Sequence, residues 1–174
     1  MFKTIKSEVL FKGREFSVRR DLVESGGKQF YKDVVIHPGA VVIIPLEKDN
    51  SIYLIRQYRH AVGAELVELP AGTLEDESPE ACASRELVEE TGFEAESFER
   101  LAEFYLAPGY STELMHVYVA KGLRRSKPSP AVDEQITLIK TSVKNAVEMI
   151  LRGEIRDAKT IASLTIFREV YGFG

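Results

Sequence analysis

Three glutamates whose spacing places them on one helical face are the residues of this sequence best suited to chemistry. Glu86, Glu89 and Glu90 stand at positions i, i+3 and i+4 of a helix predicted over residues 79–91, and residues so spaced are neighbours on a helix surface. Like charges at this spacing repel one another by roughly a few tenths of a kcal/mol per pair. Hard divalent ions such as Mg²⁺ prefer carboxylate oxygens and bind them together with substrate phosphates. The cluster therefore predicts either a metal site that acts on a phosphate compound or a solvated acidic face.

The residues around the cluster favour the metal site. Ser78 is a typical N-cap residue for this helix, and Gly92 ends it directly after the glutamates. Leu87 and Val88 give the helix an apolar side that anchors it against a core. Upstream, the Leu-Pro-Ala-Gly turn of residues 69–72 can bring a backbone carbonyl close to the helix, and such an oxygen would complete an oxygen-rich site.

The elements that position the cluster follow from the periodicity of the apolar residues. Alternation or short β-branched runs predict strands at residues 5–11, 15–23, 29–36, 41–46, 51–58, 65–69, 98–106, 116–119 and 135–139. Ser142 caps a helix that runs to about residue 151, and a second helix is predicted over residues 158–171. No linker divides the chain, so we expect one domain of strands and helices, with a hairpin arm in the first 38 residues.

Length and composition limit the classes of protein to which the chain can belong. The 174 residues suit a single domain, and the hydrophobic and charged fractions of 44% and 29% are those of globular proteins. Cys82 is the one cysteine, which excludes an intrachain disulfide and a zinc site of several thiolates and points to a reducing compartment. The net charge of −4 and the lack of a basic stripe predict no nucleic-acid partner.

The N-terminus and the apolar runs indicate a protein outside the membrane. Charged residues interrupt the first 13 residues, so no signal peptide is predicted. The longest apolar run, residues 40–46, is far shorter than the roughly 20 residues that span a bilayer. We therefore expect a soluble, cytoplasmic protein with no membrane partner.

Residues 85–93 resemble the second half of the Nudix box, whose pattern is G-x5-E-x7-R-E-U-x-E-E-x-G-U with U an aliphatic or bulky apolar residue. The matching residues are Arg85, Glu86, Leu87, Glu89, Glu90, Gly92 and Phe93. Seven residues separate Glu77 from Arg85, so Glu77 matches the first glutamate. Only four residues separate Gly72 from Glu77, where the family has five. Either this loop is one residue shorter or Ala71 stands at the glycine position; we favour the shorter loop, because Glu-Leu-Pro-Ala-Gly at 68–72 matches the usual segment before the box.

Features outside the box resemble the ADP-ribose pyrophosphatase branch of the Nudix family. They are His-Pro-Gly-Ala-Val at 37–41, Ile-Arg-Gln-Tyr-Arg at 55–59 and Pro108, which lies 15 residues after Phe93 in a loop similar to the PG-rich loop of the branch. The resemblance covers roughly residues 14–155. It implies an α/β fold, namely the Nudix α/β/α sandwich with a mixed β-sheet and an N-terminal antiparallel β arm. Residues 1–38 would form the arm and residues 39–174 the hydrolase domain.

The resemblance implies a Mg²⁺-dependent pyrophosphohydrolase, with Mn²⁺ as the alternative ion, that cleaves ADP-ribose to AMP and ribose 5-phosphate. The implied metal ligands are Glu86, Glu89, Glu90 and the backbone carbonyl of Ala71, and Glu89 is also counted among the catalytic residues. Members of the branch generally form homodimers whose N-terminal strands exchange and help to build the partner's substrate site. A homodimer is therefore expected here.

The remaining candidates bind substrate or move a proton. An arginine can bridge phosphate oxygens in a bidentate manner; Arg59 is the first candidate and Arg56 the second, and strand alternation puts them on opposite faces. The resemblance adds Glu68, Pro108 and Glu113 as substrate-binding candidates. For the general base, which a mobile acidic loop often supplies in this branch, we favour Glu134 over Asp133, with Glu113 as a rival. Arg85, counted as catalytic, is expected to orient the acidic helix by ion pairing.

Two alternatives remain open from the sequence. The first is hydrolysis of another nucleoside diphosphate sugar, a dinucleotide or an oxidised nucleotide. The second is a catalytically silent Nudix domain that binds a nucleotide as a sensor. The complete set of Glu86, Glu89 and Glu90 argues against a silent domain, whereas the short box loop argues mildly for it.

Overall fold

Strand β4 (Ala40–Leu46) forms the centre of the fold because its apolar run suits a strand that is covered on both faces. Val42 and Ile44 point to one face, where they pack among residues of helices α2 (Val143–Leu151) and α3 (Ala158–Tyr171). Val41 and Ile43 point to the other face and pack against helix α1 (Pro79–Thr91). The computed structural model describes residues 1–126 and 136–173.

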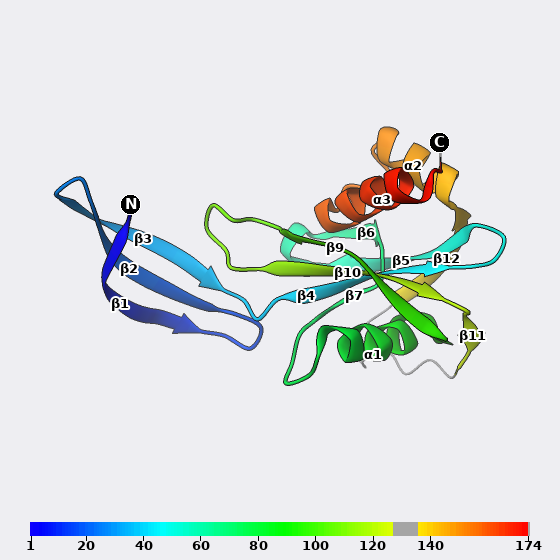
Figure 1. Ribbon diagram of the computed structural model, residues 1–174, viewed down its shortest axis with the longest axis horizontal. Helices are drawn as coiled ribbons and strands as arrows, with labels where there is room; N and C mark the ends of the chain where they lie inside the picture. The colour runs from blue at the N-terminus through cyan, green and yellow to red at the C-terminus, as the bar shows by residue number, and fades with distance from the viewer. Residues whose placement is uncertain (127–135, 174) are drawn as a thin grey trace.

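Around β4 the chain forms a seven-stranded mixed sheet in the order β12-β5-β4-β10-β9, with β6 beside β5 and β7 beside β4. Its other strands are β5 (Ser51–Arg59), β6 (Ala64–Glu68), β7 (Ala71–Thr73), β9 (Ser97–Tyr105), β10 (Leu114–Lys121) and β12 (Ile136–Ser142). Strands β4 and β10 run parallel, whereas the other pairs are antiparallel. Figure 1 shows α1 on one side of this sheet and α2 with α3 on the other, so the predicted α/β/α sandwich is confirmed.

The helices begin and end where their capping residues predict. Ser78 Oγ accepts a hydrogen bond from the Ala81 N–H at the start of α1, and Gly92 ends it with a φ of 71°, a left-handed conformation that glycine adopts readily. Ser142 caps α2 and Asp157 caps α3. No helix in the described residues is long and apolar enough to cross a bilayer.

The N-terminal residues form a three-stranded antiparallel sheet, which confirms the predicted antiparallel β arm. Its strands are β1 (Lys3–Lys12), β2 (Ser17–Ser25) and β3 (Lys28–Ile36). Strand β2 lies in the middle and pairs with both β1 and β3. Figure 1 shows this arm projecting from the body, and β1 is exposed throughout.

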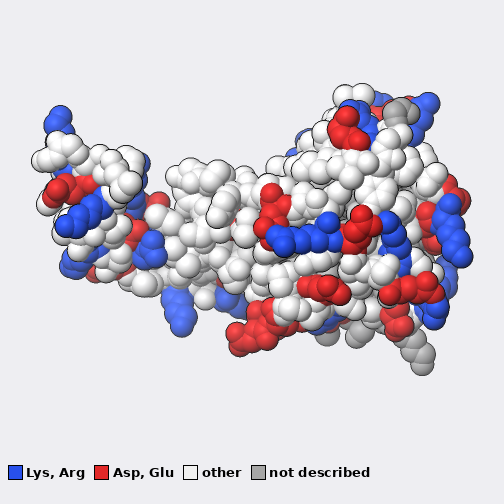
Figure 2. All heavy atoms as spheres, in the orientation of Figure 1, with Lys and Arg blue, Asp and Glu red and all other residues white. Residues whose placement is uncertain are grey.

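Several short elements went unpredicted because their pattern is too brief to show a period. They are the 3₁₀ turn η1 (His60–Val62) and strands β7, β8 (Phe93–Glu94) and β11 (Arg124–Arg125). The predicted strand at 135–139 is found as β12, although Gln135 lies outside the described residues. On the face drawn in Figure 2 acidic and basic side chains intermingle over both parts of the molecule.

Candidate active site

The acidic face of α1 packs directly against strand β7. The Ala71 N–H donates a hydrogen bond of 2.9 Å to Glu90 Oε2. The Glu86 carboxylate lies so close to Gly72 that a Cβ added there would sit 2.0 Å from Glu86 Cδ and Oε1. A side chain at residue 72 would displace the Glu86 carboxylate, whereas residue 71 carries one, which supports Gly72 as the glycine of the box and hence the shorter loop.

Arg85 joins the carboxylates of the box into one charged cluster. It donates hydrogen bonds to Glu77 at 2.6 Å, to Glu86 at 2.7 Å and to Glu89 at 3.0 Å. The hydrogen bond from Arg85 lowers the pKa of Glu77 against the opposing effect of desolvation. Arg85 thus forms the ion pairs with the acidic helix that the sequence predicts, and it also pairs with Glu77.

The carboxylate and carbonyl oxygens of α1 and β7 are of the type that binds a hard divalent ion. Within the described part of the chain, no three Asp, Glu, His or Cys side chains converge on a point where a metal ion could be held. Glu86 and Glu89 instead receive hydrogen bonds from Arg85, and Glu90 receives one from Ala71. Carboxylates beside backbone carbonyls are nevertheless the donor set that Mg²⁺ and Mn²⁺ take, and the Glu86 carboxylate lies close against Gly72 of the half-buried strand β7.

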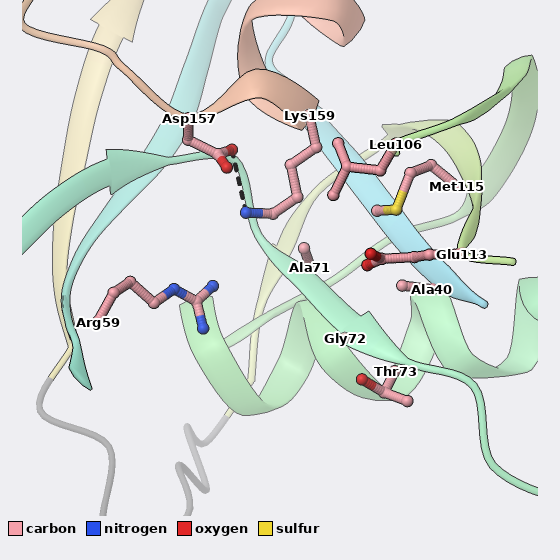
Figure 3. Close-up of a pocket in the computed structure, with 10 residues that line it drawn as sticks. All are labelled: Ala40, Arg59, Ala71, Gly72, Thr73, Leu106, Glu113, Met115, Asp157 and Lys159. Atoms are coloured by element: carbon pink, nitrogen blue, oxygen red, sulfur yellow. Dashed lines mark ion pairs between the residues drawn. The ribbon is translucent and has the colours of Figure 1, made fainter. Parts of the chain in front are cut away.

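A cavity of about 250 Å³ opens beside Ala71 and Gly72 (Figure 3). In Figure 3 the Arg59 guanidinium, the Lys159 amine and the Glu113 carboxylate enter it from different elements. Among the described residues the lining consists of Ala40, Arg59, Ala71, Gly72, Thr73, Leu106, Glu113, Met115, Asp157 and Lys159. The cavity thus presents two cations and two carboxylates beside the acidic helix.

A buried carboxylate holds both cations of the cavity. Glu68 is 1% exposed and accepts hydrogen bonds from Arg59 Nε at 2.9 Å and Arg59 Nη2 at 2.7 Å. Lys159 Nζ also donates to Glu68, and it lies 3.0 Å from Asp157 Oδ2. Burial opposes ionisation of Glu68, but the hydrogen bonds and charges of Arg59 and Lys159 outweigh it and lower its pKa. Glu68 is therefore not among the residues that line the cavity, but it holds in place two residues that are, Arg59 and Lys159.

The other predicted residues lie in different places. Arg56 is exposed and does not line the cavity, as strand alternation relative to Arg59 predicts. Pro108 is exposed in the loop between β9 and β10 and is likewise not part of the lining. Glu134 and Asp133 lie outside the described residues.

Sequence reasoning missed Asp157 and Lys159. Asp157 directly precedes the helix predicted over residues 158–171, but the place of this helix start beside the cavity depends on a contact between residues 91 positions apart, from Lys159 to Glu68. Met115 and Leu106 were missed as well, because apolar residues in or directly after strands give no signal of a cavity. Cys82 is fully buried, and desolvation raises the pKa of its thiol to about 12, so it belongs to the core.

The chain matches known proteins over most of its length. The family model of the NUDIX domain matches residues 36–164. A protein of Bacillus methanolicus named methanol dehydrogenase activator is 40% identical over 166 residues, which are 93% of this chain and 90% of that protein. An ADP-ribose pyrophosphatase of Mycobacterium tuberculosis is 40% identical over 168 residues, which are 94% of this chain and 81% of that enzyme.

A solved structure shares the fold. The crystal structure of an ADP compounds hydrolase superposes with a TM-score of 0.87 and covers 99% of this chain and 96% of its own. The sequence identity is 24%, so this likeness concerns the architecture.

Proposed function

Because the chain belongs to the NUDIX family and is a Nudix hydrolase, we propose that it cleaves ADP-ribose to AMP and ribose 5-phosphate with Mg²⁺, or Mn²⁺ in its place. The observation that carries this proposal is that Ala71 and Gly72 belong to both parts of the site. They contact Glu90 and Glu86 of the acidic helix, and they line the cavity that Arg59 and Lys159 enter. A diphosphate bound there would lie near oxygen ligands for a cation and near two basic side chains.

Different residues of the site would bind the metal ion and the phosphates. Glu86, Glu89, Glu90 and the Ala71 carbonyl would hold the divalent ion, which when bound polarises the phosphate and lowers the pKa of the attacking water. Arg59 uses Nε and Nη2 for Glu68, and its guanidinium has five N–H donors in all. The remaining donors face the cavity and suit phosphate oxygens.

Three carboxylates are candidates for proton transfer or for binding hydroxyl groups. We assign the general base to Glu134, following the family resemblance, with Asp133 as its neighbour. Glu113 lines the cavity and suits a ribose hydroxyl, since an ionised carboxylate accepts hydrogen bonds. Pro108 stays a candidate only for the rim of the site, and Arg56 for a surface contact.

We also propose a homodimer, which the family resemblance implies. Pockets for small molecules usually measure roughly 300–1,000 Å³, and this one measures about 250 Å³. It would take the diphosphate and terminal sugar, so the nucleoside would lie outside it. The exposed arm, which we assign to residues 1–38 beside a hydrolase domain of 39–174, offers a surface to a second copy that could cover the nucleoside. We also keep the cytoplasm as the proposed location, in line with the single cysteine.

The experiment is a substrate panel with and without Mg²⁺. It contains ADP-ribose, a UDP-sugar, a dinucleoside polyphosphate, a nucleoside triphosphate and NAD, the last because one relative is named for its effect on a dehydrogenase. Mg²⁺-dependent release of AMP from ADP-ribose, well above the other compounds, is the expected result. If another compound were preferred, the proposed metal-dependent hydrolysis would stand and ADP-ribose would be wrong as the substrate. Nucleotide binding without any turnover would identify a sensor.

A further inference from the structure

The end of the arm is fastened to the loop of residues 107–113 between β9 and β10. The Val35 N–H donates to the Tyr110 carbonyl at 2.8 Å, and the Thr112 N–H donates to the Val35 carbonyl at 3.0 Å. The Thr112 hydroxyl accepts from the His37 N–H at 2.9 Å and donates to the His37 carbonyl at 3.1 Å. We call these four residues the clasp. In Figure 1 the β9–β10 turn reaches toward the arm at this point.

The clasp is next in sequence to Glu113, a residue that lines the cavity. Glu113 follows Thr112 directly, and its carboxylate enters the cavity in Figure 3. The Glu113 carbonyl accepts a hydrogen bond from the Leu106 N–H at 3.1 Å, and its own N–H donates to Ser111 Oγ at 3.1 Å. The backbone of Glu113 is therefore held on its N-terminal side by a loop whose outer end is attached to the arm.

A single hydroxyl group carries much of this attachment. Thr112 is exposed, so the apolar core does not hold its position. Its hydroxyl makes two of the four hydrogen bonds in the clasp, both to the main chain of His37. His37 in turn belongs to the corner that leads from the arm into β4, where the Gly39 N–H donates to its Nδ1 at 3.1 Å.

We propose that Thr112 is a positioning residue through which the arm holds Glu113 in the substrate cavity. The inference rests on the proposed function, since it takes Glu113 as a contact for the substrate. Its consequence is that the orientation of the arm, and hence anything bound to the arm, affects substrate affinity through the clasp.

The test replaces the hydroxyl and keeps the shape. In T112V both side-chain hydrogen bonds are lost, and the KM for the preferred substrate should rise about three- to tenfold, the effect of one or two hydrogen bonds, while kcat stays within about twofold. T112S should restore the wild-type KM because the hydroxyl returns. T141V is the matched control: Thr141 Oγ1 accepts from Asn145 Nδ2 at 2.8 Å, and no part of Thr141 lines the cavity.

A double variant shows whether Thr112 acts through its neighbour. In the E113A background T112V should leave KM unchanged, because the carboxylate that it positions is already lost. If the KM effects of T112V and E113A multiplied in the double variant, the proposal would be overturned, and the same holds for a T112S variant that behaves like T112V.

A measurement without substrate separates this inference from the proposed function. Amide hydrogen exchange of the peptides 33–39 and 107–114 should be faster in T112V than in the wild type, and unchanged in T112S. If the wild type turns over none of the panel compounds while T112V shows this faster exchange, the proposed function fails and the clasp stands. Unchanged exchange in T112V would overturn the clasp whatever the activity.

Discussion

Arg59 and Glu68 form a bidentate ion pair between the neighbouring strands β5 and β6, with donor–acceptor distances of 2.9 and 2.7 Å. Glu68 is 1% exposed, whereas 39% of the Arg59 side chain is exposed at the cavity. The buried carboxylate thereby fixes the orientation of a guanidinium that would otherwise rotate freely. Such a fixed fork is suited to phosphate, which arginine recognises through its planar geometry.

Replacing Glu68 with Gln should weaken both the fold and substrate binding. The change leaves Arg59 and Lys159 without their buried counter-charge, and removal of one partner from a buried pair costs about 3–5 kcal/mol. We expect a loss in the free energy of unfolding toward the lower end of that range, because Gln keeps one oxygen acceptor, together with a higher KM. Urea denaturation and steady-state kinetics would measure both. E65Q, at an exposed residue of the same strand, should change neither, and equal effects of the two variants would contradict the role of Glu68.

Replacing Glu90 with Gln should nearly abolish turnover while the protein stays folded. The amide keeps an oxygen for the Ala71 N–H but loses the charge that a divalent ion requires. A bound metal stabilises the transition state by several kcal/mol. Losing part of this stabilisation corresponds to a fall in kcat of about a hundredfold or more. E80Q, at an exposed residue in the first turn of the same helix, is the control. Activity that survives E90Q would show that the metal assignment is wrong.

The substitution G72A should displace Glu86 without unfolding the chain. The new methyl group would lie 2.0 Å from the Glu86 carboxylate, which is the flexible end of a side chain and can move aside. We expect a large loss of activity and of Mg²⁺ binding by calorimetry, with a melting temperature close to that of the wild type. In G109A the added methyl meets no atom within 4 Å. If G72A were as active as G109A, the contact between β7 and the acidic helix would have no part in catalysis.

Replacing Arg85 with Gln should destabilise the protein in a pH-dependent manner. The folded-state pKa of Glu77 is lowered from its ordinary value of 4.5 by Arg85, so the pair stabilises the fold above that pH. The contribution is lost as the pH falls through the lowered folded-state pKa. The stability difference between wild type and R85Q should thus be about 1–2 kcal/mol at pH 7 and should shrink below pH 4.5. R168Q removes an exposed arginine that pairs with its neighbour Glu169 and should show little loss at either pH.

Replacing Lys159 with Met should raise the KM for a diphosphate substrate more than it lowers kcat. The amine lines the cavity and is held by Glu68 and Asp157, so its loss removes a cation from the place proposed for the phosphates. An effect of about tenfold corresponds to 1.4 kcal/mol of lost binding. K144M, at an exposed residue of α2, should have wild-type kinetics. A KM unchanged in K159M would place the phosphates elsewhere.

The sequence alone determined the parts of the protein that local patterns specify. The bounds of α1 follow from Ser78 and Gly92, because a cap acts on the backbone within one turn. The acidic face of Glu86, Glu89 and Glu90 follows from helical geometry, and the motif around it identified the family. Alternation along β5 separated Arg56 from Arg59, since side chains on a strand point to opposite faces.

Only the tertiary structure decided which distant residues meet. Lys159 reaches Glu68 over 91 positions of sequence, and Thr112 meets His37 over 75 positions. Neither contact has a local signature, because each depends on how the sheet, α3 and the arm are arranged in space. Motifs in the sequence therefore specified the chemistry of the acidic helix, whereas the packing of separate elements created the cavity beside it.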